Sequence, residues 1–406
     1  MKILYLHQYF ITPDSAGGTR SYEMARRLVA AGHEVHMITS DGQGNFSGSG
    51  WRETNEAGIH VHWSKVRYSN HMGFARRLIA FSNFALKSTV KAIMLKGDII
   101  FATSTPLTIA FPALLASSWN HLPFVFEVRD MWPDVPIAIG AVRNRILKRL
   151  ARWLELTTYK RSAHIIALAP GMREDIIAKG IPAEKVSVIP NGCDLDVFSA
   201  ISESASPRHQ HAWLCERKLV IYAGTVGRAN GVDYLVRLAR EVAVIDPEIR
   251  FVVFGGGREW EAVYKLAHKL GIIDRNFFMF ASLPKKQIAS WLRAADVHVA
   301  LMRGPRSYLK DAVNNKFFDA LAAGKPIANN FDGWQSRIAE EAGVGLIIDP
   351  EDIPAAAQCL VEKLHDEEWL RQIPGRAREL AEGRFSRDRL ALQLEAVLTA
   401  AWVKAG

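Results

Sequence analysis

Apolar runs alternate with amphipathic stretches along the first half of the chain. One of these stretches, RSYEMARRLVAAG at 20–32, has the period of a helix and stops at Gly32. Short apolar strands that alternate with helices favour a parallel sheet covered by helices on both faces. The runs expected as strands are KILYL (2–6), HEVHMIT (33–39), DIIFATS (98–104), FVFEVRD (124–130), HIIALAP (164–170) and KVSVIP (185–190).

The pattern pauses over residues 199–217, which are polar and lack a clean period, and then restarts. We therefore predict an α/β fold of two doubly wound units, 1–198 and 218–385, joined by a linker at 199–217. A cleft between two such sheets is a usual place for a ligand. The second set of expected strands is KLVIYAG (218–224), IRFVVFGGG (249–257), FFMFAS (277–282), DVHVALM (296–302), PIANN (326–330) and GVGLIID (343–349).

The composition suits a folded protein of two domains. Of the 406 residues, 49% are hydrophobic, which argues against a disordered chain. Lys and Arg exceed Asp and Glu by nine, 51 against 42. This excess favours an anionic partner such as a phosphate ligand, a membrane surface or nucleic acid, although many soluble proteins are equally basic without a specific partner.

The cysteines and the apolar segments bear on the compartment. The three cysteines are an odd number without a C-x-x-C pair, so neither a disulfide framework nor a zinc site is indicated. The opening MKILYLHQYF is too short and too quickly polar for a signal peptide. The most apolar stretch, PLTIAFPALLASSW at 106–119, has two prolines and several hydroxyls and makes a poor membrane span. We expect a cytoplasmic protein.

Two loops that follow expected strands have residues suited to a phosphate ligand. Gly17 and Gly18 permit close approach of the backbone and directly precede a helix, whose first N–H groups suit an anion. Arg228 follows the strand 218–224, where a guanidinium can bridge two phosphate oxygens. A plain turn at the glycines and an ordinary surface arginine are the alternatives.

The segment LKDAVNNKFFDALAAGKP, 309–326, predicts a short helix with a polar face. Asn is a favoured cap, so the helix should begin near Val313 or Asn314 and end at Gly324. Asn315 and Asp319 are four residues apart and share a face away from the apolar stripe. Asp319 could accept two ribose hydroxyls, while the N–H groups of 314–317 suit a diphosphate. A solvated surface face is the alternative.

Other patterns do not predict metal chemistry. Asp194 and Asp196 form a D-x-D that follows VIPNGC in a turn, where helix or turn capping is expected. His33 and His36 do not match H-E-x-x-H, and His60 and His62 lack a third ligand. We expect neither a metal nor a cofactor.

Two expected helices are basic and amphipathic. The stretches 73–97 and 143–153 interleave Lys and Arg with Phe, Leu and Ile. Such helices suit an anionic lipid surface, and ordinary surface helices of a sheet domain have a similar composition. We find no recognisable module that binds RNA or DNA.

Several pieces in order make the chain similar to a known family. The chain resembles the retaining glycosyltransferases of family 4, which have the GT-B fold of two Rossmann-like domains that face each other across a cleft. It looks closest to bacterial enzymes of O-antigen and capsule synthesis such as the N-acetyl-L-fucosamine transferases. In this architecture helix 386–406 is expected to pack back on the first domain. The matching pieces are GGTRSYEMARRLVAAGHEVHMITS (17–40), VIPNGCDLDVF (188–198), YAGTVGRANGVDYL (222–235), FFDALAAGKPI (317–327) and GVGLIIDPED (343–352).

The resemblance implies roles for individual residues. The family has two glutamates separated by seven residues, one at the donor sugar and one at the ribose; here these positions are Asp311 and Asp319, each one methylene shorter. The family has a lysine a few residues after the phosphate-binding arginine. In this chain the corresponding position after Arg228 is Asn230. Lys316 is a candidate to supply that charge.

Further residues of the site are implied in the same way. Asp130 stands near the family's base position and would orient or deprotonate the acceptor; a carboxylate paired with Arg129 is the alternative. We therefore expect Asp130, Arg228 and Asp311 to be catalytic. The residues expected to bind the donor are Gly17, Gly18, Arg228, Asn315, Lys316, Phe317 and Asp319.

The implied reaction is a metal-independent sugar transfer with retention of configuration. The donor would be a nucleoside diphosphate sugar, UDP-linked by resemblance, and the acceptor a hydroxyl of a lipid-linked saccharide at the inner face of a bacterial plasma membrane. An epimerase of the same fold and a non-enzymatic binder of membranes or nucleic acid are the alternatives. The epimerase would consume the donor without an acceptor.

Overall fold

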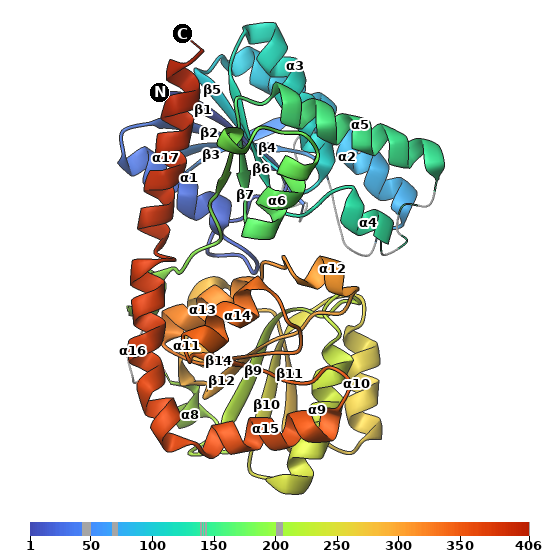
Figure 1. Cartoon of the computed structure of the whole chain (residues 1–406), viewed down its shortest axis with the longest axis vertical. Helices are drawn as coiled ribbons and strands as arrows, with labels where there is room; N and C mark the ends of the chain where they lie inside the picture. Colours follow the sequence, from blue (N-terminus) through green and yellow to red (C-terminus); the bar gives the residue numbers. More distant parts are fainter. Residues whose placement is uncertain are drawn as a thin grey trace. The chain divides into compact units, whose positions relative to one another are not determined.

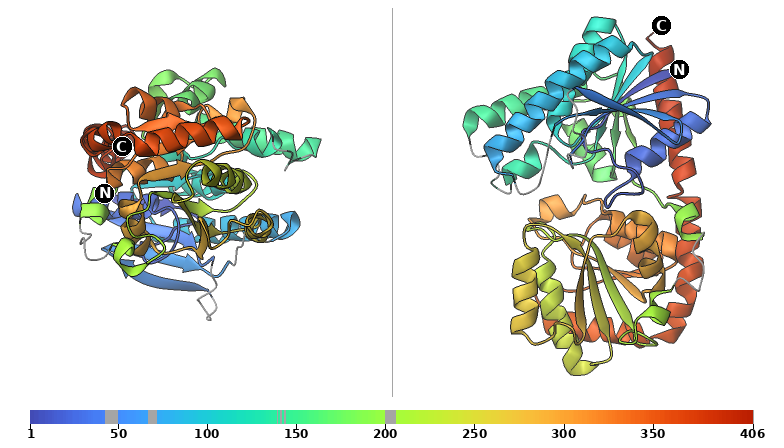
Figure 2. Two further views of the ribbon diagram at one scale, coloured as in Figure 1. Left: turned by 90° about the horizontal axis from the view of Figure 1, so that it is seen from below. Right: turned by 180° about the vertical axis from the view of Figure 1, so that it is seen from behind.

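The computed structural model describes residues 1–42, 50–66, 72–138, 140, 142, 144–199 and 206–405. The chain divides into two compact units, each built around its own sheet (Figures 1 and 2). Unit 1 comprises 1–12, 19–190 and 388–406, and unit 2 comprises 13–18 and 191–387.

Unit 1 has an eight-stranded sheet in the order β3-β4-β2-β1-β5-β6-β7-β8. All neighbours are parallel except β3 and β4, which form an antiparallel hairpin at one edge. The pattern of apolar runs predicted β1, β2, β5, β6, β7 and β8 and missed the hairpin of β3 and β4; β3 is polar and has no buried residue. The strands are β1 (Lys2–Leu6), β2 (Glu34–Ser40), β3 (Trp51–Glu56), β4 (Ile59–Ser64), β5 (Ile99–Thr103), β6 (Phe124–Val128), β7 (His164–Ala167) and β8 (Val186–Val188).

The last helix of the chain contributes to the core of unit 1. Leu390, Leu394 and Leu398 are buried in one cluster with Ile3 and Val35 of the sheet. This burial of apolar side chains from a helix distant in sequence holds the end of the chain on unit 1. The helices of the unit are α1 (Arg20–Ala30), α2 (Phe74–Leu95), α3 (Ala110–Asn120), α4 (Asp134–Ala138), α5 (Arg145–Arg161), α6 (Pro170–Ala178) and α17 (Arg387–Val403), with short 3₁₀ turns at Leu107–Ile109 and Ala183–Lys185.

A buried ion pair links the first helix of unit 1 to its sheet. Arg20 begins α1 and donates to the Glu127 carboxylate of β6 from Nε at 3.0 Å and from Nη2 at 2.7 Å. Arg20 also donates to the carbonyls of Ile189 and Pro190, and Thr103 donates to Glu127. The neighbouring cations outweigh desolvation and lower the pKa of Glu127, so the buried pair is charged and satisfied.

Unit 2 has a six-stranded sheet that is parallel throughout, in the order β11-β10-β9-β12-β13-β14. The order runs outward from β9 in both directions, which places a topological switch point between β9 and β12. The strands are β9 (Leu219–Thr225), β10 (Arg250–Gly256), β11 (Phe277–Ala281), β12 (Val297–Ala300), β13 (Ile327–Asn329) and β14 (Gly345–Ile347).

Apolar side chains of the helices of unit 2 are buried in three hydrophobic clusters with residues of the sheet. The helix expected within 309–326 is α13. The helices are α7 (Leu195–Ser199), α8 (Pro207–Gln210), α9 (Val232–Ile245), α10 (Trp260–Lys269), α11 (Lys285–Ala294), α12 (Arg306–Leu309), α13 (Asn315–Ala323), α14 (Trp334–Glu341), α15 (Ile353–His365) and α16 (Glu367–Gly383).

The segment expected as a linker belongs to unit 2 where it is described. Residues 200–205 of the expected linker lie outside the described residues. From 206 onward, Arg208 donates to the carbonyls of Ala294 and Arg217 and to the carboxylate of Asp296 at 2.7 Å. A single arginine thus ties this polar segment to the residues that precede β9 and β12.

Candidate functional site

The carboxyl end of β9 meets the start of α13 at a lysine. The Nζ of Lys316 lies 4.5 Å from the centroid of the Tyr222 ring, which projects from β9. A Cβ atom at Gly224 would lie 2.8 Å from this Nζ, and the φ of 156° at Gly224 is one that residues with a side chain rarely adopt. The strand end, the aromatic ring and the helix start therefore shape one position for a cation.

Lys316 is a cation without an ion-pair partner among the described residues. Its contact with Tyr222 is a cation–π interaction, and Asp319 acts on it only through space. Burial lowers the pKa of Lys316 to about 8, although the charge of Asp319 raises it. A partly desolvated ammonium group that lacks a carboxylate is suited to bind an anion.

Helix α13 begins and ends where its sequence predicts. Asn314 is the N-cap, and its Oδ1 accepts from the N–H of Lys316 at 3.1 Å. Gly324 ends the helix with φ 67°, in the left-handed region. The helix buries Phe317 and Phe318, so its Asn315–Asp319 face turns away from the core.

We had expected the N–H groups at the start of α13 to be free for a diphosphate, but those of Asn314, Lys316 and Phe317 are hydrogen-bonded within the protein. The Asn314 N–H donates to Gln335 Oε1 at 2.6 Å, and the Phe317 N–H donates to the Asn314 carbonyl at 3.3 Å. Phe317 itself is fully buried, edge to face against Phe318 and Phe385. The Phe317 ring therefore belongs to the core of unit 2, and its role in binding the donor stays a prediction.

The glycine loop lies against the start of α13. Residues 13–18 group with unit 2, and a Cβ atom at Gly18 would lie 3.0 Å from Asn315 Nδ2. Gly17 has φ 140°, which a side chain would disfavour. The structure thus places Gly18 of this loop beside Asn315, and their role in binding the donor stays a prediction.

Asp319 is paired with a lysine that the sequence reading did not single out. Its Oδ1 accepts from Lys285 Nζ, at the start of α11. Lys285 Nζ also lies 3.7 Å from Asp194 Oδ2, and Asp194 is bound by Arg387 at 2.8 Å. No sequence signal marks Lys285, because it is one of two adjacent lysines at an ordinary helix start. Asp194, expected only to cap a turn, is part of this buried ion network.

Asp311 and Arg228 differ in exposure. Asp311 lies between α12 and α13, is buried, and has Lys310 Nζ 3.4 Å from its Oδ2. Arg228 is exposed in the loop after β9, with no ion-pair partner among the described residues. The neighbouring Arg303 is occupied, since it donates to Asp233 at 2.7 Å and its own N–H binds the Ala229 carbonyl. Arg228 is thus the cation of this loop that is available to a ligand.

In unit 1, Asp130 is exposed and follows β6. Its Oδ2 accepts from Thr105 Oγ1 at 3.0 Å. Arg129 instead contacts Nε2 of His7 at 3.3 Å, so a hydroxyl rather than Arg129 orients the Asp130 carboxylate. Burial and the charge of Arg129 hold the pKa of His7 well below its usual value, which keeps this imidazole neutral.

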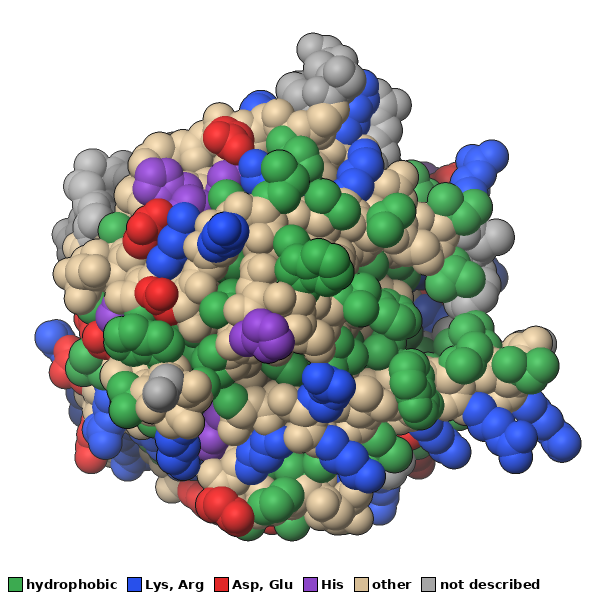
Figure 3. Space-filling model, turned by 90° about the horizontal axis from the view of Figure 1, so that it is seen from above, with side chains coloured by type: hydrophobic (Ala, Val, Ile, Leu, Met, Phe, Trp, Pro, Cys, Tyr) green, Lys and Arg blue, Asp and Glu red, His purple; other side chains and the backbone are tan. Residues whose placement is uncertain are grey.

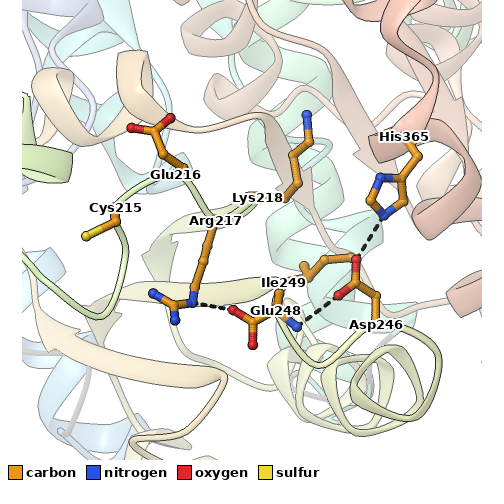
Figure 4. A pocket seen from close by; sticks show the side chains of 8 residues that line it. All are labelled: Cys215, Glu216, Arg217, Lys218, Asp246, Glu248, Ile249 and His365. Carbon is orange, nitrogen blue, oxygen red and sulfur yellow. Dashed lines mark hydrogen bonds and ion pairs between the residues drawn. The ribbon is translucent and has the colours of Figure 1, made fainter.

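A cavity of about 400 Å³ lies at the amino ends of the strands of the second sheet, away from the carboxyl end of β9 (Figure 4). Its charged side chains satisfy one another: Arg217 binds Glu248 at 2.6 Å and His365 binds Asp246 at 2.8 Å. Cys215 and Lys218 line it at the amino end of β9, remote along the strand from Gly224. Open parallel sheets bind ligands at the carboxyl ends of their strands, so this cavity is not the donor site. Within the described ranges, no group of three or more His, Cys, Asp or Glu side chains is arranged to hold a metal ion.

The two halves of the chain match two family models. Residues 15–192 match the glycosyl transferase 4-like domain, and residues 206–380 match glycosyl transferases group 1. The first match lies mainly in unit 1, and the second lies in unit 2.

Curated relatives and solved structures agree with these matches. The chain is 23% identical over 373 residues to the colanic acid biosynthesis glycosyl transferase WcaI of Escherichia coli. The aligned region covers 87% of this chain and 90% of that protein. It is 23% identical to a GDP-mannose-dependent phosphatidylinositol monomannoside mannosyltransferase of Mycobacterium tuberculosis, over 72% of this chain and 73% of the relative.

Two solved structures have the same fold. Sucrose-phosphate synthase from Thermosynechococcus elongatus superposes with a TM-score of 0.79 at 16% identity, over 99% of both chains. HepE from Anabaena, in complex with UDP, superposes with a TM-score of 0.72 at 16% identity, over 98% of this chain and 100% of the other. With a glycosyl transferase 4-like first half, a group 1 second half and two parallel-sheet α/β units, the chain belongs to the glycosyltransferases of the GT-B fold.

Proposed function

We propose that this enzyme is a retaining, metal-independent glycosyltransferase of bacterial surface polysaccharide synthesis. It moves a sugar from a UDP-sugar to a hydroxyl of a lipid-linked saccharide. The observation that supports this most is Lys316 at the carboxyl end of β9, a partly buried cation beside Gly224 that has no carboxylate partner among the described residues. The diphosphate of a nucleotide sugar is an anion of the required charge.

The residues of unit 2 fit the parts of such a donor. Lys316 and Arg228 bind the diphosphate and stabilise the charge that grows on it as the glycosidic bond breaks. Asp319 accepts the ribose hydroxyls, and Asp311 contacts the donor sugar. Two cations supply the charge neutralisation that a metal supplies in other sugar-nucleotide enzymes.

The acceptor side of the proposal rests on unit 1. Asp130 is held by Thr105 with its carboxylate exposed, which suits the orientation or deprotonation of an acceptor hydroxyl. The leaving phosphate oxygen assists in removing the acceptor proton, as retention without an enzymic nucleophile requires. UDP as the nucleotide is favoured by the fold shared with HepE, whose solved complex contains UDP.

We further propose that unit 1 docks on an anionic membrane from the cytoplasmic side through α2, α3 and α5. The exposed surface of these helices combines large apolar side chains with arginines, and Figure 3 shows hydrophobic and basic side chains next to one another on one face. On α5 the exposed Arg145, Arg149 and Arg152 alternate with apolar positions. Such a face suits anionic lipid headgroups above acyl chains. The exposed apolar residues are Leu78, Ile79, Leu86, Val90 and Met94 on α2, Phe111, Leu115 and Trp119 on α3, and Ile146, Leu150 and Trp153 on α5.

Among the described residues, Arg76–Leu95 within α2 is the stretch whose length and composition would suit a membrane span, with a mean hydropathy of 1.3. Of this stretch, 39% is buried. Phe84 and Ala92 of α2 are buried, and the helix packs on α3 and β2. This packing favours a helix that lies along a membrane surface as part of unit 1.

Replacing Leu150 and Trp153 together by Ser should weaken binding to vesicles that contain phosphatidylglycerol about tenfold or more, since each buried apolar side chain contributes about 1.5–3 kcal/mol. Co-sedimentation measures this. Val244→Ser, at an exposed position of α9 in unit 2, is the matched control and should leave binding unchanged. An equal loss of vesicle binding in both variants would contradict a binding face on α2, α3 and α5. So would binding that does not depend on phosphatidylglycerol.

The proposed reaction is tested by thermal shift and turnover with the wild-type protein. UDP should raise the melting temperature more than GDP, ADP or dTDP, because a ligand that binds only the folded state stabilises it. A panel of UDP-sugars that includes UDP-N-acetyl-L-fucosamine, incubated with and without membrane-extracted lipid-linked saccharides, should then release UDP only with an acceptor. Sugar isomerisation without an acceptor would support the epimerase, and no nucleotide response would overturn the proposal.

A further inference from the structure

The ion network around Asp319 has an uneven geometry. Arg387 already satisfies Asp194, with Nε 2.8 Å from Oδ1, and Lys285 lies 3.7 Å from the other oxygen of the same carboxylate. The direct hydrogen bond of Lys285 is to Asp319. The network therefore uses Arg387 for Asp194 and Lys285 for Asp319.

Lys285 is well placed to restrict the Asp319 side chain. The Lys285 side chain is 11% exposed and that of Asp319 is 21% exposed. The lysine lies beside the Phe198 ring, 5.7 Å from its centroid. Despite its burial, the two aspartates raise the pKa of Lys285, so it is a charged donor at neutral pH. The hydrogen bond uses Oδ1 of Asp319, and the Asp319 side chain is the more exposed of the two.

Aspartate is one methylene shorter than the glutamate of the family, so its carboxylate has less reach and fewer rotamers. A fixed hydrogen bond from Lys285 turns this short side chain into a preorganised acceptor. This effect acts on the part of the ligand that bears hydroxyls.

We propose that Lys285 is a positioning residue that aims the Asp319 carboxylate at the ribose hydroxyls of the donor. The inference rests on the proposed function, since it assumes that Asp319 binds a nucleoside diphosphate. Lys285 itself does not contact the ligand. Its effect is confined to recognition of the pentose and does not extend to the phosphates.

The test compares uridine 5′-diphosphate with its 2′,3′-dideoxy analogue, by calorimetry. The wild-type protein should prefer the ribose form about tenfold or more, since hydrogen bonds to a charged acceptor contribute about 1.5–3 kcal/mol. Lys285→Met should reduce this preference to about twofold or less, and Lys285→Arg should restore most of it. Affinity for inorganic pyrophosphate should stay unchanged in both. Lys265→Met, an exposed lysine of α10 paired with Glu261, should behave as wild type.

A double-mutant cycle separates positioning from a structural role. In an Asp319→Asn background, Lys285→Met should have no further effect on the ribose preference, because the lysine acts only through the carboxylate. If Lys285→Met binds UDP with an unaltered ribose preference, or lowers pyrophosphate affinity equally, the inference is overturned and the proposed function stands. If wild type does not bind UDP, the proposed function fails and the inference fails with it.

Discussion

Replacing Asp319 by Ala raises the dissociation constant for UDP about 100-fold. The carboxylate is expected to accept two ribose hydroxyls, and each hydrogen bond to a charged group contributes about 1.5–3 kcal/mol, of which part is recovered by water in the variant. The position of Asp319 supports this size of effect, because it lies one turn into α13 from Lys316 and its side chain remains partly exposed beside Lys285. Titration calorimetry with UDP measures the loss.

The control for this variant concerns the fold. Removing one partner of a largely buried ion pair leaves Lys285 with Asp194 at 3.7 Å, which costs stability. Asp319→Asn keeps the shape and one acceptor oxygen, and should lose about tenfold in affinity with a smaller change in melting temperature. Pyrophosphate affinity should be retained in both variants. A folded Asp319→Ala protein with unaltered affinity for UDP would show that the pentose binds elsewhere.

Replacing Lys316 by Met lowers turnover about 10²–10³-fold, the usual cost of removing a preorganised charge that stabilises a leaving group. The ammonium group has no other partner to satisfy among the described residues, so its removal does not orphan a carboxylate. Methionine fits the space between the Tyr222 ring and Gly224 and retains the apolar part of the contact. The ratio of kcat to KM, measured with a UDP-sugar and a saccharide acceptor, reports the effect.

The pH dependence of binding gives Lys316 a second measurable signature. Its pKa in the folded protein is about 8, below the ordinary 10.5, because burial disfavours the charged form. The ammonium group therefore loses its proton as pH rises through about 8, and UDP affinity should fall over the same range. A bound diphosphate raises this pKa, so binding at pH 8 takes up protons. The burial cost of the charge weakens stability below pH 8 and is relieved as pH rises from about 8 towards 10.5.

Lys316→Met removes this pH dependence, and its UDP affinity should be flat between pH 7 and about 9. Arg228→Ala is the useful comparison, because a guanidinium does not titrate in this range and the variant should retain the decline above pH 8. A pH profile that is identical in wild type and in Lys316→Met would assign the anion site to other groups.

Much of the fold follows from local pattern. The strands and helices around each sheet come from apolar runs and helical periods, and α13 begins at Asn314 and ends at Gly324 because a side-chain cap and a left-handed glycine are local features. The same locality predicts the buried stripe of Phe317 and Phe318. Glycines, an arginine and acidic residues after strands are likewise visible in the sequence, since parallel sheets place such loops at one edge.

Tertiary structure decided which of these groups are free for a ligand. The N–H groups of Asn314 and Lys316 are taken by Gln335 and by the cap, whereas the Lys316 ammonium group has no carboxylate partner in the part of the chain that the structure describes. Asp319 is paired with Lys285, whose own sequence position has no distinguishing pattern. Hydrogen bonds and ion pairs between residues far apart in sequence depend on how elements pack, and no period or propensity encodes them. For this protein, sequence determined the sheets and the chemical groups at their edges, and packing determined which charges remain available.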